Sequence, residues 1–82
     1  MFAQIIHNSQ VDGTENEGGN DYHAVIERST DGEGFYLFGD SLEACAKELA
    51  AWEEDLLDDG VTLYRSEWPV ATIYKDGSYS SH

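Results

Sequence analysis

The sequence has few cations: four Lys and Arg stand against 17 Asp and Glu in 82 residues, for a formal net charge of −13 at pH 7. This imbalance argues against direct binding to nucleic acid or to an anionic membrane surface. The single cysteine excludes an internal disulfide and favours a reducing, cytoplasmic setting. No apolar run approaches the roughly 20 residues of a membrane span, and residues 1–7 lack the basic region of a signal peptide.

Catalytic and metal-binding motifs are equally scarce. The sequence contains no Gly-x-Ser-x-Gly, P-loop or Cys-x-x-Cys, and His7, His23 and His82 have no ligand spacing between them. From Asp12 the chain partly follows a calcium-loop pattern, but Glu17 stands where glycine is required and His23 where the bidentate glutamate is required. We therefore expect no enzyme activity, no cofactor and no metal site.

The patterns that are present predict one small domain, residues 1–82. Alternation of apolar and polar residues, bounded by turn sequences rich in Gly, Asp and Ser, predicts five strands. They are residues 2–7, 22–28, 35–38, 61–66 and 70–74. One helix follows the third strand, so the order is β-β-β-α-β-β, which favours an α+β fold in which an antiparallel sheet carries one amphipathic helix on a face. Residues 8–21 are expected to form a flexible acidic loop and residues 78–82 a frayed tail.

The helix is the clearest predicted element. Asp40 followed by Glu43 matches a capping box, and Gly60 is a typical C-terminal stop. Between them, apolar residues recur at the three-and-four spacing of one helical face: Leu42, Cys45, Leu49, Trp52 and Leu56. Because Cys45 lies on this face, we expect it to be a small buried hydrophobic residue rather than a nucleophile.

Acidic residues crowd the end of this predicted helix as Glu53, Glu54, Asp55, Asp58 and Asp59. The C-terminal end carries the negative pole of the helix dipole, so each acid there is opposed by roughly 0.3–1 kcal/mol. Glu53 also falls inside the apolar arc; either it pairs with Arg65 or the helix ends earlier. A sequence shaped only for stability would place Lys or Arg at this end, so the acids indicate a positively charged partner.

The predicted contact surface combines the outer helix face with the loop at residues 8–21. It consists of Glu43, Glu54, Asp55, Asp58, Asp59, Glu15, Glu17 and Asp21. Carboxylates on a rigid scaffold can imitate the phosphates of a duplex, which carries one charge per ~1.7 Å of its axis. Exposed aromatic residues are candidates for interface anchors, with a place in the sheet core as the alternative for each: Tyr22, Tyr36, Tyr64, Trp68 and Tyr74. The plain alternative for the acids is a solvated face that keeps a small protein soluble.

In size, charge and plan the chain resembles the small acidic proteins that phages make against host defence, the anti-CRISPR and DNA-mimic inhibitors. The resemblance lies in the sheet-plus-helix pattern and in the acid-rich segment AAWEEDLLDDG at residues 50–60. It implies a non-enzymatic inhibitor in the host bacterial cytoplasm. Such a protein binds a basic nucleic-acid-binding partner, a Cas protein or a CRISPR surveillance complex, and blocks target DNA. A homodimer through a sheet edge is compatible with the pattern.

A second resemblance competes with the first. The segment DYHAVIERSTDGEGFYLFGDSLEACAKELAAWEEDL, residues 21–56, is similar to the HicB type of antitoxin: strand, turn, strand and a capped helix. This resemblance implies neutralisation of a small basic RNA-binding toxin. The sequence departs from that pattern because the Pro and Gly-Cys of the usual second strand are absent. The usual DNA-binding segment is also replaced by residues 61–74, which are predicted to form strands.

Overall fold

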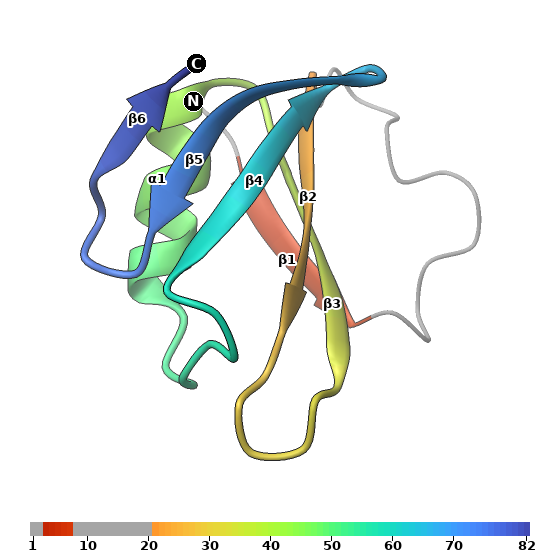
Figure 1. The fold of residues 1–82 in the computed structure, drawn as a ribbon, viewed down its shortest axis with the longest axis vertical. Helices are drawn as coiled ribbons and strands as arrows, with labels where there is room; N and C mark the ends of the chain where they lie inside the picture. The colour runs from red at the N-terminus through yellow and green to blue at the C-terminus, as the bar shows by residue number, and fades with distance from the viewer. Residues whose placement is uncertain (1–2, 8–20) are drawn as a thin grey trace.

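Six strands and one helix follow one another in the computed structural model, which describes residues 3–7 and 21–82 (Figure 1). They are β1 (Ala3–His7), β2 (Tyr22–Glu27), β3 (Gly34–Gly39), α1 (Leu42–Ala51), β4 (Gly60–Arg65), β5 (Trp68–Tyr74) and β6 (Tyr79–Ser81). The strands form one antiparallel sheet in the order β1-β3-β2-β4-β5-β6. The predicted α+β fold, an antiparallel sheet with one helix, is confirmed.

The hairpin of β2 and β3 closes through the predicted turn. Tyr22 pairs with Gly39 at one end of the ladder and Glu27 with Gly34 at the other. In the turn, the N–H of Gly32 donates to the carbonyl of Arg28 over 2.7 Å, and Gly32 has a φ of 70°. Glycine adopts this left-handed backbone without the steric cost that a Cβ would bring. The turn chemistry therefore fixes the register of the hairpin.

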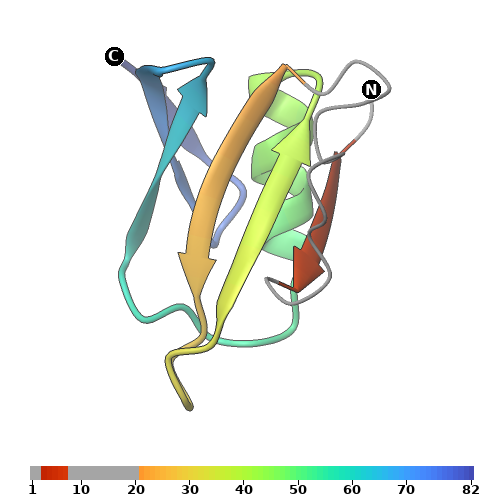
Figure 2. The ribbon, with the colours of Figure 1, turned by 90° about the vertical axis from the view of Figure 1, so that its right-hand side faces the viewer.

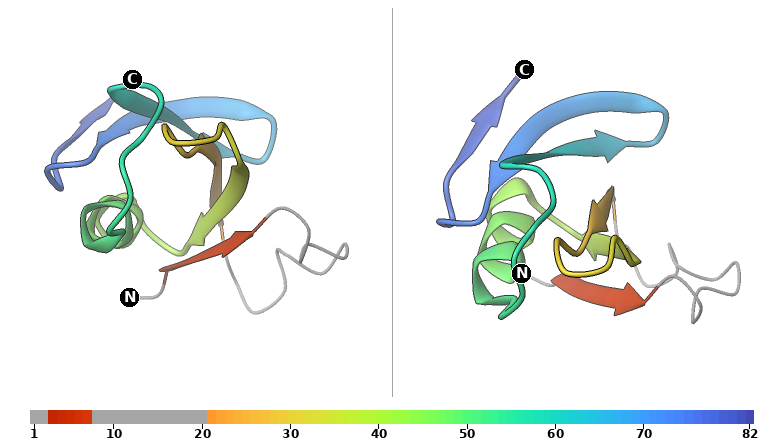
Figure 3. Two further views of the ribbon diagram at one scale, coloured as in Figure 1. Left: turned by 90° about the horizontal axis from the view of Figure 1, so that it is seen from below. Right: turned by 60° about the horizontal axis from the view of Figure 1, so that its bottom comes forward.

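The sheet curves around the helix, as the side and end-on views show (Figures 2 and 3). Helix α1 contacts β1, β3, β5 and β6, so strands near both edges of the sheet close on it. The core fills the space between them and is built of alternate strand residues and one helix stripe: Ala24, Ile26, Phe35, Leu37, Cys45, Ala46, Leu49, Val61, Leu63, Ala71 and Ile73. No described helix is long and apolar enough to cross a membrane.

Both ends of the helix differ from the prediction. The N-cap is Ser41, not Asp40: its backbone is extended, and its Oγ accepts from the N–H of Ala44 over 3.0 Å. The helix ends at Ala51, well before Gly60, with Trp52 as its C-cap. The three-and-four spacing of apolar residues predicted a longer helix because it includes Trp52 and Leu56. Both side chains do pack against the core, but from the segment that follows the helix.

The C-terminal residues are not frayed. Tyr79–Ser81 forms β6, which pairs with β5 from Ala71↔Ser81 to Ile73↔Tyr79. The backbone N–H of His82 also donates to the carbonyl of Val70 over 2.9 Å. This short polar strand has little apolar periodicity, and its pairing with β5 depends on the turn at Gly77, whose φ is 91°. The flexible loop predicted at residues 8–21 lies outside the described residues except for Asp21.

Candidate functional site

Two chain segments meet at one end of the sheet: the turn between β2 and β3, and the loop between α1 and β4 (Figure 1). The N–H of Ser29 donates to the carbonyl of Asp55, and the N–H of Leu57 donates to the carbonyl of Glu27, both over 2.9 Å. Arg28 and Leu56 face each other between these bonds as an antiparallel bridge. The loop therefore continues the sheet beyond the end of β2, and these tertiary bonds replace those of a longer helix.

This junction concentrates negative charge. Eight carboxylates and one arginine belong to the residues from Glu27 to Glu33 and from Glu53 to Asp59, for a local net charge of −7. We call these eight carboxylates the acidic end: Glu27, Asp31, Glu33, Glu53, Glu54, Asp55, Asp58 and Asp59. Six of them are exposed, and Glu33 and Glu54 are half-buried. Residues distant in sequence thus form one negatively charged surface.

Arg28 ties the two segments together. Its Nε and Nη2 donate to the two carboxylate oxygens of Asp31 over 2.9 and 2.6 Å, and its Nη1 lies 3.0 Å from both oxygens of Glu54. This fork matches the planar geometry of carboxylates. The bond from Arg28, with a further one from the N–H of Glu33, lowers the pKa of Asp31 from 3.8 to about 2. The Arg28 guanidinium therefore holds Asp31 and Glu54 in fixed positions and offsets the repulsion between their carboxylates.

The acidic end rests on packed aromatic rings. Phe35 meets Trp52 edge to face at a centroid distance of 5.1 Å and His7 at 4.9 Å. The guanidinium carbon of Arg28 lies 5.3 Å from the centre of the Phe35 ring. His7 also lies 2.6 Å from an oxygen of Glu33. These contacts give the carboxylates a rigid base, which reduces the entropy lost when a partner binds.

The prediction that the acids oppose the helix dipole, and so indicate a positively charged partner, is wrong because the helix ends at Ala51. Asp55, Asp58 and Asp59 lie beyond its last turn and do not extend it. The cation that this helix end requires comes from another element, since Lys75 Nζ donates to the carbonyl of Trp52. Glu53 likewise falls outside the helix, so of the two explanations for its place in the apolar arc, the earlier helix end is confirmed.

The predicted contact residues separate into groups. Glu54, Asp55, Asp58 and Asp59 belong to the acidic end. Glu43 and Asp21 do not: Glu43 lies in the first helical turn, ~12 Å from the helix end by rise, and Asp21 precedes β2, about 20 Å from its far end. Glu43 is also paired with Lys47 at 3.2 Å. The structure thus does not place them with the other four, while Glu15 and Glu17 lie outside the described residues.

Glu27, Asp31 and Glu33 belong to the acidic end but were not in the predicted contact surface. Asp31 and Glu33 stood out in the sequence only as acids in a turn, and Glu27 as an outward position of a strand. No local feature of the sequence shows that the acidic turn between β2 and β3 lies beside the acidic loop between α1 and β4. Their proximity to residues 53–59 arises from the pairing of Arg28 with Leu56.

The predicted aromatic anchors are exposed to different degrees. Trp68 is 72% exposed and Tyr64 is 37% exposed, whereas Tyr22, Tyr36 and Tyr74 are half-buried. None of the five belongs to the fully buried core. Only Tyr64, in β4, borders a cavity near the acidic end.

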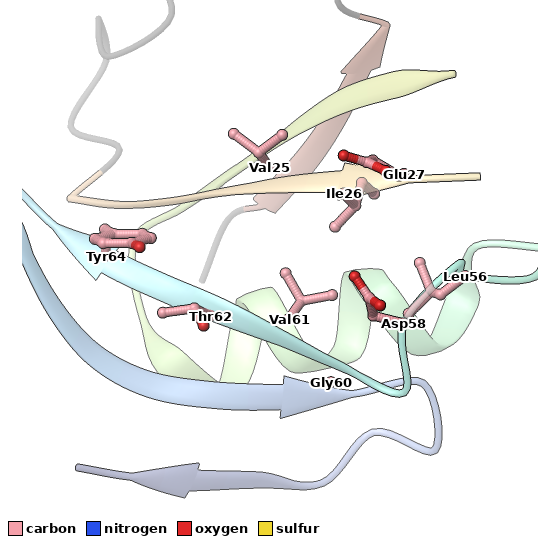
Figure 4. A pocket seen from close by; sticks show the side chains of 9 residues that line it. All are labelled: Val25, Ile26, Glu27, Leu56, Asp58, Gly60, Val61, Thr62 and Tyr64. Atoms are coloured by element: carbon pink, nitrogen blue, oxygen red, sulfur yellow. The ribbon is translucent and has the colours of Figure 1, made fainter. Parts of the chain in front are cut away.

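That cavity has a volume of about 310 Å³ and lies where β2 and β4 diverge (Figure 4). It is lined by Val25, Ile26, Glu27, Leu56, Asp58, Gly60, Val61, Thr62 and Tyr64. A second, shallower hollow of about 370 Å³ lies beside the helix end and is lined by Glu48, Ala51, Trp52, Glu53 and Glu54. Acidic side chains border both hollows.

Comparison of the chain with protein-family models, curated proteins and solved structures found no match.

A metal cluster and the thiol of Cys45 are the other candidate sites among the described residues. Among them, no group of three or more His, Cys, Asp or Glu side chains is arranged to hold a metal ion. Burial first, and the nearby charges of Asp40 and Glu48 next, raise the pKa of the Cys45 thiol to about 12, so the reactive thiolate is not populated near neutral pH. What the acidic end can do is attract and hold cations through fixed, exposed carboxylates.

Proposed function

We propose that the protein is a non-enzymatic inhibitor of a basic, nucleic-acid-binding protein complex, of the kind that phages direct against host defence. Its target would be a Cas protein or a CRISPR surveillance complex in the bacterial cytoplasm. The acidic end would occupy the groove that receives target DNA. This proposal uses no catalysis and no direct contact between the protein and nucleic acid.

The observation that carries the proposal is the union of two acidic segments on one rigid surface. Six exposed carboxylates lie at an end with a local net charge of −7, and the molecule as a whole carries −13. The backbone bonds of Ser29 and Leu57 and the Arg28 fork hold this surface in shape. Such a field accelerates encounter with a basic partner and competes for the cations that would otherwise bind phosphates.

Apolar groups beside the carboxylates support a specific interface rather than a merely soluble face. Val25 and Leu57 are 57% and 53% exposed. Both lie next to the acidic end, in β2 and in the loop before β4. Interfaces that bind tightly join a charged rim to a few apolar anchors, because charge alone contributes little once salt screens it.

The proposal is tested by affinity capture. Tagged protein would be incubated with lysate of bacteria that carry an active CRISPR-Cas system, washed across a salt series and then challenged with target duplex. We expect recovery of a Cas subunit that the duplex displaces and that elutes as salt increases. Recovery of nothing specific, or of a Cas subunit that saturating duplex leaves in place, would contradict inhibition at the nucleic-acid site.

A HicB-like antitoxin is the second candidate, and one observation favours it. The hairpin of β2 and β3 leads directly into the capped helix α1, which is the order that this resemblance implies. Strands β4, β5 and β6 occupy the place of the DNA-binding segment. In the same capture experiment this candidate predicts one small basic toxin and no Cas subunit.

A further inference from the structure

Strands β2 and β4 are neighbours in the sheet but pair along only part of their length. Their ladder is limited to Tyr22↔Arg65 and His23↔Tyr64. Beyond His23 the strands diverge, and the next backbone bond on that side of β2 is the one between Leu57 and the carbonyl of Glu27. The sheet therefore contains a gap between β2 and β4 (Figure 4). The His23–Tyr64 pair closes it at one end and the bond between Leu57 and Glu27 at the other.

Val25 is the β2 residue whose backbone faces this gap. Backbone groups alternate sides along an antiparallel strand, and the carbonyl of Glu27 points to the β4 side. Two residues earlier, the N–H and carbonyl of Val25 point the same way, and Val25 has no register partner in the β2–β4 ladder.

The walls of the gap combine apolar and polar groups in similar measure. Ile26 and Val61 belong to the buried core and form its floor, and Leu56 closes one end. Val25, 57% exposed, borders the mouth. A cavity of about 310 Å³ with such walls lies at the small end of the range for ligand pockets and suits one long side chain rather than a whole strand.

Two carboxylates stand at the wide end of the gap, Glu27 from β2 and Asp58 from the loop before β4, on opposite sides of it (Figure 4). Within the described residues, the structure gives neither carboxylate a hydrogen bond or an ion-pair partner. Arg28, the cation next to Glu27 in sequence, is already bound to Asp31 and Glu54. The charge at this end of the gap therefore complements a cation from outside.

We propose that the gap is a socket for one arginine side chain of the protein partner. The alkyl stem would lie against Val25 and Val61, and the guanidinium would bridge Glu27 and Asp58. Arginine fits better than lysine because its planar fork can donate to two carboxylates at once and is weakly hydrated. The inference rests on the proposed function, of which it names the anchor, since arginines are prominent among interface hot spots.

The test is a nuclear magnetic resonance titration of the full chain with the peptide acetyl-Gly-Arg-Gly-amide at 0.15 M ionic strength. The citrulline peptide, of the same shape but without charge, and the lysine peptide serve as comparisons. We expect saturable shifts centred on the amides of Val25, Glu27 and Thr62, with a Kd on the order of 1 mM for the arginine peptide. The citrulline and lysine peptides should bind at least tenfold more weakly.

Matched variants separate the socket from the general negative field. Glu27→Gln with Asp58→Asn should weaken arginine-peptide binding roughly tenfold or more. Glu53→Gln with Asp59→Asn removes the same charge from the acidic end outside the socket and should leave the Kd within about twofold, since screened charges contribute little. Equal losses in both variants, equal binding of the citrulline or lysine peptide, or shifts that avoid Val25 and Thr62 would overturn the inference.

Failure of the arginine socket can be distinguished from failure of the proposed function. If the peptide titration fails while a Cas subunit is still captured and displaced by duplex, the arginine socket alone is wrong. If the peptide occupies the socket but no nucleic-acid-binding partner is captured, the proposed function alone is wrong.

Discussion

At the scale of single residues, Arg28 has the greatest structural influence on the candidate site. It is the one arginine among eight carboxylates, and it binds two of them, Asp31 and Glu54, which leaves this trio with a net charge of −1. Glu33 lies against His7, and the other five carboxylates, Glu27, Glu53, Asp55, Asp58 and Asp59, are exposed to a partner. The sequence does not reveal this role, because the distance from Arg28 to Glu54 is 26 positions along the chain and depends on the tertiary pairing of two loops.

The Arg28 fork predicts how stability responds to acid. Because the folded pKa of Asp31 is depressed to about 2 from 3.8, its contribution is present above pH ~4 and is lost as pH falls towards 2. Replacing Arg28 with Gln should return the pKa of Asp31 towards its ordinary value and lower the melting temperature at pH 7. Carboxyl resonances and thermal unfolding between pH 2 and 7 would measure both. An unchanged titration of Asp31 in the Arg28→Gln variant would contradict this account.

Cys45 is predicted to be inert in the native protein. It is fully buried, and its thiol pKa is raised to about 12. A thiol reagent at pH 8 should therefore react only as fast as the protein unfolds, and urea should accelerate the reaction. The variant Cys45→Ser should lose about 1–3 kcal/mol of unfolding free energy through its buried hydroxyl, and Cys45→Ala should lose less. Rapid labelling of native protein would show that the thiol is accessible.

At the scale of elements, five of the six strands were predictable, whereas β6 and the end of the helix were not. Residues 22–28 and 61–66 were predicted as strands and coincide with β2 and β4 to within one residue, because period-two alternation is a local property. The apolar spacing of the helix also continued through Trp52 to Leu56, but the backbone on either side of Leu56 bonds to Ser29 and Glu27 instead of continuing the helix. The C-terminal strand β6 was missed because its stability comes from β5 rather than from its own polar residues.

The helix end yields a prediction about Lys75. Its ammonium donates to the carbonyl of Trp52 and is the cation at a helix terminus whose last turn has no basic residue. Replacing Lys75 with Met keeps the alkyl stem but removes the charge, so the unfolding free energy should fall by about 1 kcal/mol. Urea denaturation would measure this loss.

Lys47→Met is the matched control, since Lys47 pairs with Glu43 on the exposed helix surface. That substitution should cost only about 0.3–0.5 kcal/mol. If Lys47→Met cost as much as Lys75→Met, the special role of Lys75 at the helix end would be refuted.

At the scale of the whole molecule, the sequence predicted the sign of the charge but not its arrangement. Four of the eight predicted contact residues lie in the acidic end, and Glu43 and Asp21 lie elsewhere. The missing information was which loops become neighbours, and that follows from sheet order and from the bridge between Arg28 and Leu56. Composition alone cannot supply such non-local pairing.

The central claim is that the acidic end, rather than the net charge of the chain, contacts a basic nucleic-acid-binding partner. It is tested most directly by the affinity of the captured Cas subunit for two variants with the same change in charge. One carries Asp55→Lys, Asp58→Lys and Asp59→Lys in the acidic end, and the other carries Asp21→Lys, Glu43→Lys and Glu67→Lys outside it. With both variants shown to be folded by thermal unfolding, the account predicts loss of binding in the first and near-normal affinity in the second. Normal binding by the first variant, or equal loss in both, would contradict it.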